Sequence, residues 1–94
     1  MTTIEVKDNY IQVTGHSGYA ESGHDIVCAA ISVLTESLDR YLRVTENQVE
    51  STKGDGEYKI HLKELNSAGK AIKEEFINML DEIIKEYPEY VRRI

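Results

Sequence analysis

The sequence has 94 residues, of which 40% are hydrophobic and 30% are charged. This length supports one hydrophobic core, so we predict a single globular domain over residues 1–94. The formal charge of −6, from 17 acidic and 11 basic side chains, disfavours binding to a phosphate backbone and is compatible with a basic partner. We therefore expect no direct contact with nucleic acid.

The first ten residues, MTTIEVKDNY, have neither the basic start nor the apolar run of a secretory signal. No segment approaches the roughly 18 consecutive apolar residues of a membrane span. We therefore expect a cytoplasmic protein that does not contact a membrane. Cys28 is the single cysteine, which excludes an intramolecular disulfide and a zinc site built from several thiolates.

The chain begins with two stretches of alternating apolar and polar residues. Ile4 and Val6 alternate with polar residues, as do Ile11 and Val13, and this period is typical of half-buried strands. The Asp8-Asn9 pair between them favours a turn, so we predict a β-hairpin over residues 3–14. Residues 15–23, GHSGYAESG, contain three glycines and two serines and are predicted to form a loop, a common place for functional residues.

A helix is predicted over residues 25–43, because apolar residues recur there at steps of three and four. The predicted buried stripe consists of Val27, Ala30, Ile31, Leu34, Leu38, Tyr41 and Leu42. The N-cap is either Ser22 or Asp25. We favour Asp25, because Gly23 would be a poor residue for a first helical turn.

The second half of the chain repeats this order. Residues 46–52 and 57–62 are predicted to form a hairpin with residues 53–56 as its turn, and residues 67–86 are predicted to form a helix that ends before Pro88. The buried stripe of this helix is predicted to consist of Ile72, Phe76, Met79, Leu80, Ile83 and Tyr87. Residues 89–94 form either a short strand or a frayed end. The order ββα-ββα predicts an α+β domain: an antiparallel sheet of about four strands with two helices.

Cys28 and His16 are the residues most suited to chemistry. The thiolate is the nucleophilic form of cysteine, and a position near a helix N-terminus favours it. A histidine brought close to the thiol can accept its proton. The glycine-rich loop between the two residues is long enough to fold His16 back over the start of the helix.

Two other interpretations of these residues stay open at this point. A lone cysteine in a helix is commonly a small buried apolar residue. His16, His24 and Cys28 also form a conceivable metal site, since His24 and Cys28 are four residues apart, although it lacks a fourth ligand. We expect no metal and no cofactor.

Residues 15–32, GHSGYAESGHDIVCAAIS, resemble the signature of the ribosomal-processing cysteine proteases, the Prp family. The pattern is Gly-His-x-Gly-Tyr-Ala, a short linker, Gly-x-Asp-Ile-Val-Cys-Ala-Ala, and a serine four residues after the cysteine. This chain supplies it as Gly15, His16, Gly18, Tyr19, Ala20, Gly23, Asp25, Ile26, Val27, Cys28, Ala29, Ala30 and Ser32. The element order and the length are also similar to the family. Two positions depart from it: Ser17 stands where alanine is frequent, and His24 where lysine is common.

The resemblance implies a bacterial cysteine endopeptidase, with Cys28 as nucleophile and His16 as general base. It implies supporting roles for Asp25 and Ser32. Residues 15–23 would be a substrate-binding loop that closes on the peptide, through Gly15, Gly18, Tyr19 and Gly23. Backbone N–H groups at the helix start would stabilise the oxyanion if Asp25 is the cap.

The implied substrate is a large-subunit ribosomal protein whose mature N-terminus reaches toward the peptidyl-transferase centre. Such an enzyme removes a short N-terminal extension from it, within a segment that has paired phenylalanines. The resemblance also implies a homodimer. The alternatives are a non-catalytic, ribosome-associated module that binds a peptide, and an oligomerisation domain in which Cys28 is merely buried.

Overall fold

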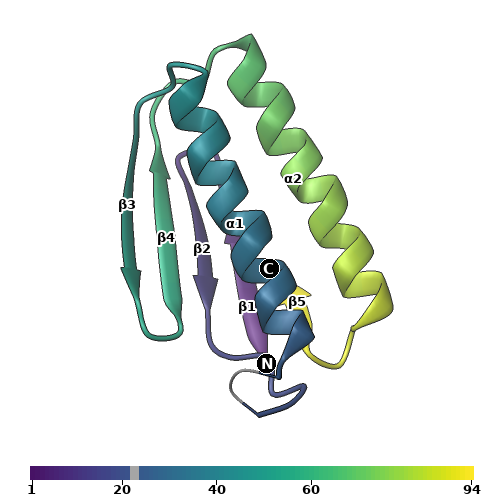
Figure 1. Ribbon diagram of the computed structural model, residues 1–94. Coiled ribbons are helices and arrows are strands. Elements are labelled where there is room, and N and C mark those ends of the chain that lie inside the picture. The colour runs from purple at the N-terminus through teal and green to yellow at the C-terminus, as the bar shows by residue number, and fades with distance from the viewer. Residues whose placement is uncertain (22–23) are drawn as a thin grey trace.

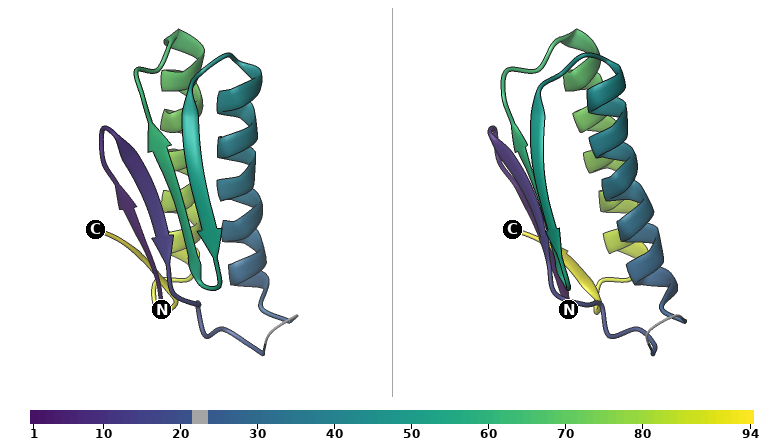
Figure 2. Two further views of the ribbon diagram at one scale, coloured as in Figure 1. Left: turned by 90° about the vertical axis from the view of Figure 1, so that its left-hand side faces the viewer. Right: turned by 60° about the vertical axis from the view of Figure 1, so that its left-hand side comes forward.

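Both helices lie on one face of a single sheet, as two views of the computed structural model show (Figure 1, Figure 2). The structure describes residues 1–21 and 24–94, so Ser22, the alternative N-cap, and Gly23, expected in the binding loop, lie outside the described residues. The elements in this part of the chain are β1 (Thr2–Val6), β2 (Tyr10–Thr14), α1 (Ile26–Val44), β3 (Val49–Gly54), β4 (Glu57–Leu62), α2 (Ser67–Glu86) and β5 (Val91–Arg93).

The sheet is mixed, and its strand order is β3-β4-β2-β1-β5. The two predicted hairpins are confirmed as antiparallel pairs, and β2 joins them by pairing antiparallel with β4. The prediction of about four antiparallel strands is incomplete, because β5 pairs parallel with β1, with Thr2 opposite Val91. β5 has three residues, too few to show a period, and its pairing partner lies at the other end of the chain.

Apolar residues from the sheet and both helices form the core between the two layers. Ile4 and Ile11 of the first hairpin are fully buried, and so is Ile60 of β4. On the helices the buried residues include Val27, Ile31, Leu38 and Leu42 of α1 and Phe76 and Leu80 of α2. These side chains fix α1 over the sheet, with its N-terminus at the end where β2 stops (Figure 1).

The predicted helix stripes are wider than the buried ones. Ala30 is exposed, and Tyr41 and Met79 are 59% and 46% exposed. The two helices cover the sheet on one side only, so residues at the outer edge of each stripe face away from the core. They line an open groove between α1 and α2 instead.

Asp25 is the N-cap of α1, as favoured from the sequence, and its side chain accepts a hydrogen bond from the Cys28 N–H. The second hairpin has a tighter turn than predicted, because β3 continues to Gly54 and β4 begins at Glu57. None of the described helices is both long and apolar enough to cross a membrane.

Candidate active site

Three segments meet at one end of the sheet: the loop after β2, the N-terminus of α1 and the β3–β4 turn (Figure 1). The Gly15 N–H donates to the Gly56 carbonyl at 2.8 Å, which joins the loop to the turn. Both glycines have positive φ, +87° for Gly15 and +66° for Gly56, a conformation that other residues rarely adopt. The backbone conformation on both sides of this hydrogen bond therefore favours glycine.

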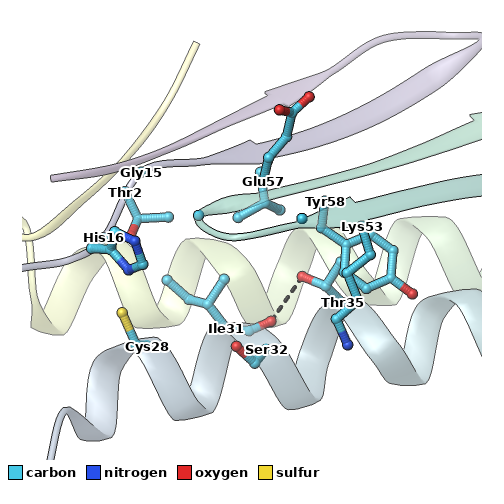
Figure 3. A pocket seen from close by; sticks show the side chains of 13 residues that line it. Thr2, Gly15, His16, Cys28, Ile31, Ser32, Thr35, Lys53, Glu57 and Tyr58 are labelled. Atoms are coloured by element: carbon cyan, nitrogen blue, oxygen red, sulfur yellow. Dashed lines mark hydrogen bonds between the residues drawn. The ribbon is translucent and has the colours of Figure 1, made fainter. Parts of the chain in front are cut away.

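Cys28 and His16 face the same cavity, of about 160 Å³ (Figure 3). The two residues also line a second cavity, together with Asp25 and Gly18. Ser32, one turn after Cys28, lines both cavities. The structure thus brings together the thiol, the imidazole and the two supporting residues that the sequence singled out.

Tyr58 of β4 also lines the first cavity. Its hydroxyl donates to the buried carboxylate of Asp39, which also accepts from Arg43 Nε at 2.7 Å. Burial and the hydrogen bond to Asp39 raise the pKa of Tyr58 well above its ordinary value. This cluster fixes α1 to the second hairpin, and it holds the cavity wall in place.

The imidazole of His16 lies against the β3–β4 turn. Its Nε2 is 3.6 Å from Oδ1 of Asp55, and both side chains are exposed. A Cβ added to Gly56 would come within 2.9 Å of His16 Nε2, so only glycine leaves room for the ring here. Sequence reasoning missed this contact, because nothing in a turn sequence shows which distant residue packs against it.

Asp25 is an ionised cap. Burial opposes its ionisation, but hydrogen bonds from the Ser17 hydroxyl and from the backbone N–H groups of Cys28 and Ala20 outweigh that effect and lower its pKa to about 2. The Cys28 N–H donates to Asp25 Oδ1 at 2.9 Å. That N–H is therefore occupied, and the expected oxyanion site at the helix start depends on the other N–H groups of the first turn.

The depressed pKa of Asp25 predicts a specific pH dependence of stability. Its folded value of about 2 lies below the ordinary 3.8, so its contribution is complete above about pH 4 and is lost as the pH falls through 2. An asparagine side chain at this position would keep the cap without the charge. We expect Asp25→Asn to be less stable than the wild type at pH 7, with a gap that closes toward pH 2. Urea unfolding at pH 7, 4 and 2 measures this, and a gap independent of pH would contradict it.

Ser17 is the site residue that sequence reasoning missed. It is only 2% exposed, and its hydroxyl donates to Asp25 Oδ2. Its backbone N–H donates to the Cys28 sulfur at 3.4 Å. The one available signal in the sequence is its departure from the alanine that is frequent at this position, and that departure by itself assigns no role.

Tyr19 and His24 do not line either of the two cavities beside the thiol. Tyr19 packs edge-to-face against Tyr87 and Tyr90, with ring centroids 5.7 and 5.2 Å apart. His24 is exposed. Within residues 1–21 and 24–94, no group of three or more His, Cys, Asp or Glu side chains is arranged to hold a metal, so the conceivable His16–His24–Cys28 site is not assembled.

A thiol and an imidazole that share a cavity at a helix N-terminus have the chemistry that a cysteine-dependent hydrolase needs. The family model described as cysteine protease Prp matches residues 1–92. The chain therefore belongs to the Prp family of cysteine proteases. No curated protein matches it.

Solved structures support this assignment. An essential ribosomal processing protease Prp from S. aureus, with a covalently linked product peptide, is 27% identical, covers 99% of this chain and 97% of its own, and has a TM-score of 0.88. The same protease with a substrate peptide is 26% identical over 99% and 95% of the two chains, with a TM-score of 0.79. A Streptococcus mutans protein is 28% identical over 98% and 89%, with a TM-score of 0.71.

Proposed function

We propose that this protein is an endopeptidase that removes the N-terminal extension of a large-subunit ribosomal protein through Cys28 and His16. The observation that carries the proposal is the shared cavity of these two side chains in a chain of the Prp family. The similar S. aureus protease is described as a ribosomal processing enzyme and has been captured with a covalently linked product peptide. A covalent product suits a nucleophilic thiol.

The reaction begins when His16 accepts the proton of Cys28. The thiolate attacks the scissile carbonyl, the C–N bond breaks, and His16 gives the proton to the leaving amine. Water then attacks the thioacyl carbonyl, releases the new carboxylate and restores the thiol. Since the Cys28 N–H already donates to Asp25, the oxyanion takes its hydrogen bonds from other N–H groups of the first helical turn, which have no partner within the helix.

Asp25 and Ser32 support this site in different ways. Asp25 caps α1 and accepts the Cys28 N–H, so it fixes the backbone from which the nucleophile projects. Ser32 lines both cavities and is placed to contact a bound peptide. Gly15 and Gly18 border one cavity each, and together with Tyr19 and Gly23 they belong to the segment that we propose to cover the substrate.

The test is cleavage of the ribosomal protein, with and without its extension, followed by mass spectrometry. We expect one cut that releases the extension, complete loss of cutting after Cys28 is alkylated, and no cut in the mature form. Binding of the extended protein without turnover would instead support a non-catalytic peptide-binding module. If the protein neither bound nor cut the extended substrate, the result would favour an oligomerisation domain.

The acidic character of the chain suits a basic ribosomal substrate. With a formal charge of −6, long-range attraction is expected to speed the encounter, and salt screens that attraction. We therefore expect kcat/KM to fall as ionic strength rises. A kcat/KM that does not depend on salt would show that charge attraction does not contribute to substrate recognition. It would leave the assignment of Cys28 as the nucleophile unaffected.

We also propose that the protein is a homodimer in the bacterial cytoplasm. The groove between α1 and α2 is lined by apolar residues that include Tyr41, Met79 and Ile72, and a second copy would cover it. Sedimentation equilibrium should show a dimer that Tyr41→Glu weakens, whereas a wild-type monomer at micromolar concentration would argue against it.

The proposed location is the cytoplasm, because Cys28 is a free thiol and a reducing compartment keeps thiols reduced. Recovery of the protein in an exported cell fraction would contradict this location.

A further inference from the structure

The Ser17 hydroxyl lies between the nucleophilic sulfur and a carboxylate. The Cys28 thiol donates to Ser17 Oγ at 3.5 Å, and Ser17 Oγ in turn donates to Asp25 Oδ2. The Tyr19 N–H also donates to Ser17 Oγ, at 3.3 Å. Because Ser17 is 2% exposed, water has little access to replace any of these bonds.

This arrangement distinguishes between the two protonation states of Cys28. A hydroxyl has one proton to donate, and Asp25, as an ionised carboxylate, can only accept. With a neutral thiol, two bonds form together: the thiol donates to Ser17 and Ser17 donates to Asp25. With a thiolate, two anions compete for the one hydroxyl proton, so one of the two bonds is lost.

The backbone N–H of Ser17 does not share this preference. It donates to the Cys28 sulfur at 3.4 Å, and this bond is available to a thiol or a thiolate acceptor. The difference between the two states therefore rests on the side-chain hydroxyl. Alanine at position 17 would keep the N–H and remove the hydroxyl.

We propose that Ser17 is a positioning residue whose hydroxyl holds Cys28 as the neutral thiol in the free enzyme. The inference rests on the proposed role of Cys28 as nucleophile. In the reaction, the S–H bond breaks and the proton passes to the imidazole of His16, while the Ser17 hydroxyl either keeps its bond to Asp25 or donates to the thiolate instead.

Other charged and titratable groups act on the sulfur in both variants alike. The groups that line the two cavities beside Cys28 come from every neighbouring element: His16, Asp25, Lys53, Asp55, Glu57 and Tyr58. Ser17→Ala removes none of these groups, and the one it touches is Asp25, which loses the bond from Ser17 Oγ. A difference between the variants therefore reports the hydroxyl together with its bond to Asp25.

The test is the rate of Cys28 alkylation by iodoacetamide from pH 5 to 10 in wild type, Ser17→Ala, Ser17→Thr and the remote control Ser37→Ala. Loss of one hydrogen bond corresponds to about a three- to tenfold change in equilibrium. We expect Ser17→Ala to react about three- to tenfold faster below the midpoint of the curve, with the midpoint shifted to lower pH and the plateau at high pH unchanged. Ser17→Thr and Ser37→Ala should follow the wild type.

An unchanged or raised midpoint in Ser17→Ala would overturn the proposal. A higher plateau with an unchanged midpoint would also overturn it, because that result reports easier access to the sulfur. Oxidation by hydrogen peroxide should be faster in Ser17→Ala at neutral pH, since the thiolate is the form that is oxidised. Alkylation needs no peptide substrate, so this test is independent of the cleavage assay. A shifted midpoint would support the role of Ser17 even if the protein did not cut the ribosomal substrate.

Discussion

Replacing His16 by alanine is expected to lower kcat/KM for peptide cleavage by about 10²- to 10⁴-fold, the usual contribution of a positioned general base. The ring shares its cavity with Cys28, and among the described residues no other imidazole lines it, so no neighbouring group of that kind replaces the lost base. Cys28→Ala should abolish cleavage, because no thioacyl intermediate can form. Single-turnover assays at pH 7 measure both losses.

The matched control for His16→Ala is His61→Ala. His61 lies on β4 with an exposed side chain, remote from both cavities, so its removal should leave cleavage within about twofold of the wild type, as for most surface substitutions. Circular dichroism and thermal unfolding establish that each variant is folded. A folded Cys28→Ala variant that still cuts the substrate would remove Cys28 from the nucleophile role.

The second large effect is expected from a residue that bears no functional group. In Gly56→Ala the new Cβ would lie 2.9 Å from His16 Nε2 at a φ of +66°, so the imidazole or the turn must move. A displacement of about 1 Å in a catalytic group commonly costs about 10²-fold in rate. We therefore expect kcat/KM to fall by about 10- to 100-fold, while KM changes little because the ring is displaced within a site that still binds peptide.

Gly54→Ala is the comparison variant, because Gly54 lies in the same hairpin and lines the same cavity, yet a Cβ there meets nothing within 4 Å. It leaves the His16 ring in place, so its kcat/KM should fall less than that of Gly56→Ala. Both variants should stay folded in thermal unfolding, with Gly56→Ala somewhat less stable because of its positive φ. Equal cleavage rates in the two variants would show that the turn does not position His16.

Local patterns predict much of this fold. The alternation around Ile4 and Ile11 places the first hairpin correctly, and the cap at Asp25 follows from side-chain chemistry next to a helical period. The pairing of Thr2 with Val91 is missed, because a three-residue strand has no readable period and its partner is distant. The exposed positions of Tyr41 and Met79 depend on which side of each helix meets the sheet, which helical period alone does not specify.

The same distinction applies to the site. Cys28 and His16 can be selected from the sequence because a thiol and an imidazole have known chemistry and are joined here by a signature, and the structure places both on one cavity; their roles as nucleophile and base stay a prediction. Ser17 stands out in the sequence only because alanine is frequent at this position in the Prp family. What its hydroxyl does depends on the groups that surround it in three dimensions, which the sequence does not show. The contact between His16 and Gly56 arises from the pairing of β2 with β4, and no pattern within the turn indicates it.

The parallel pairing of β5 with β1 has a consequence for the order in which the molecule folds. β1 lies between β2 and β5, and the Thr2 N–H donates to the Tyr90 carbonyl at 2.9 Å. During synthesis the hairpin of β1 and β2 emerges early, while one edge of β1 stays uncovered until residues 91–93 are made. Contacts of such long separation form late and slowly, and an open strand edge favours aggregation. The protease thus completes its sheet only after nearly the whole chain has been synthesised.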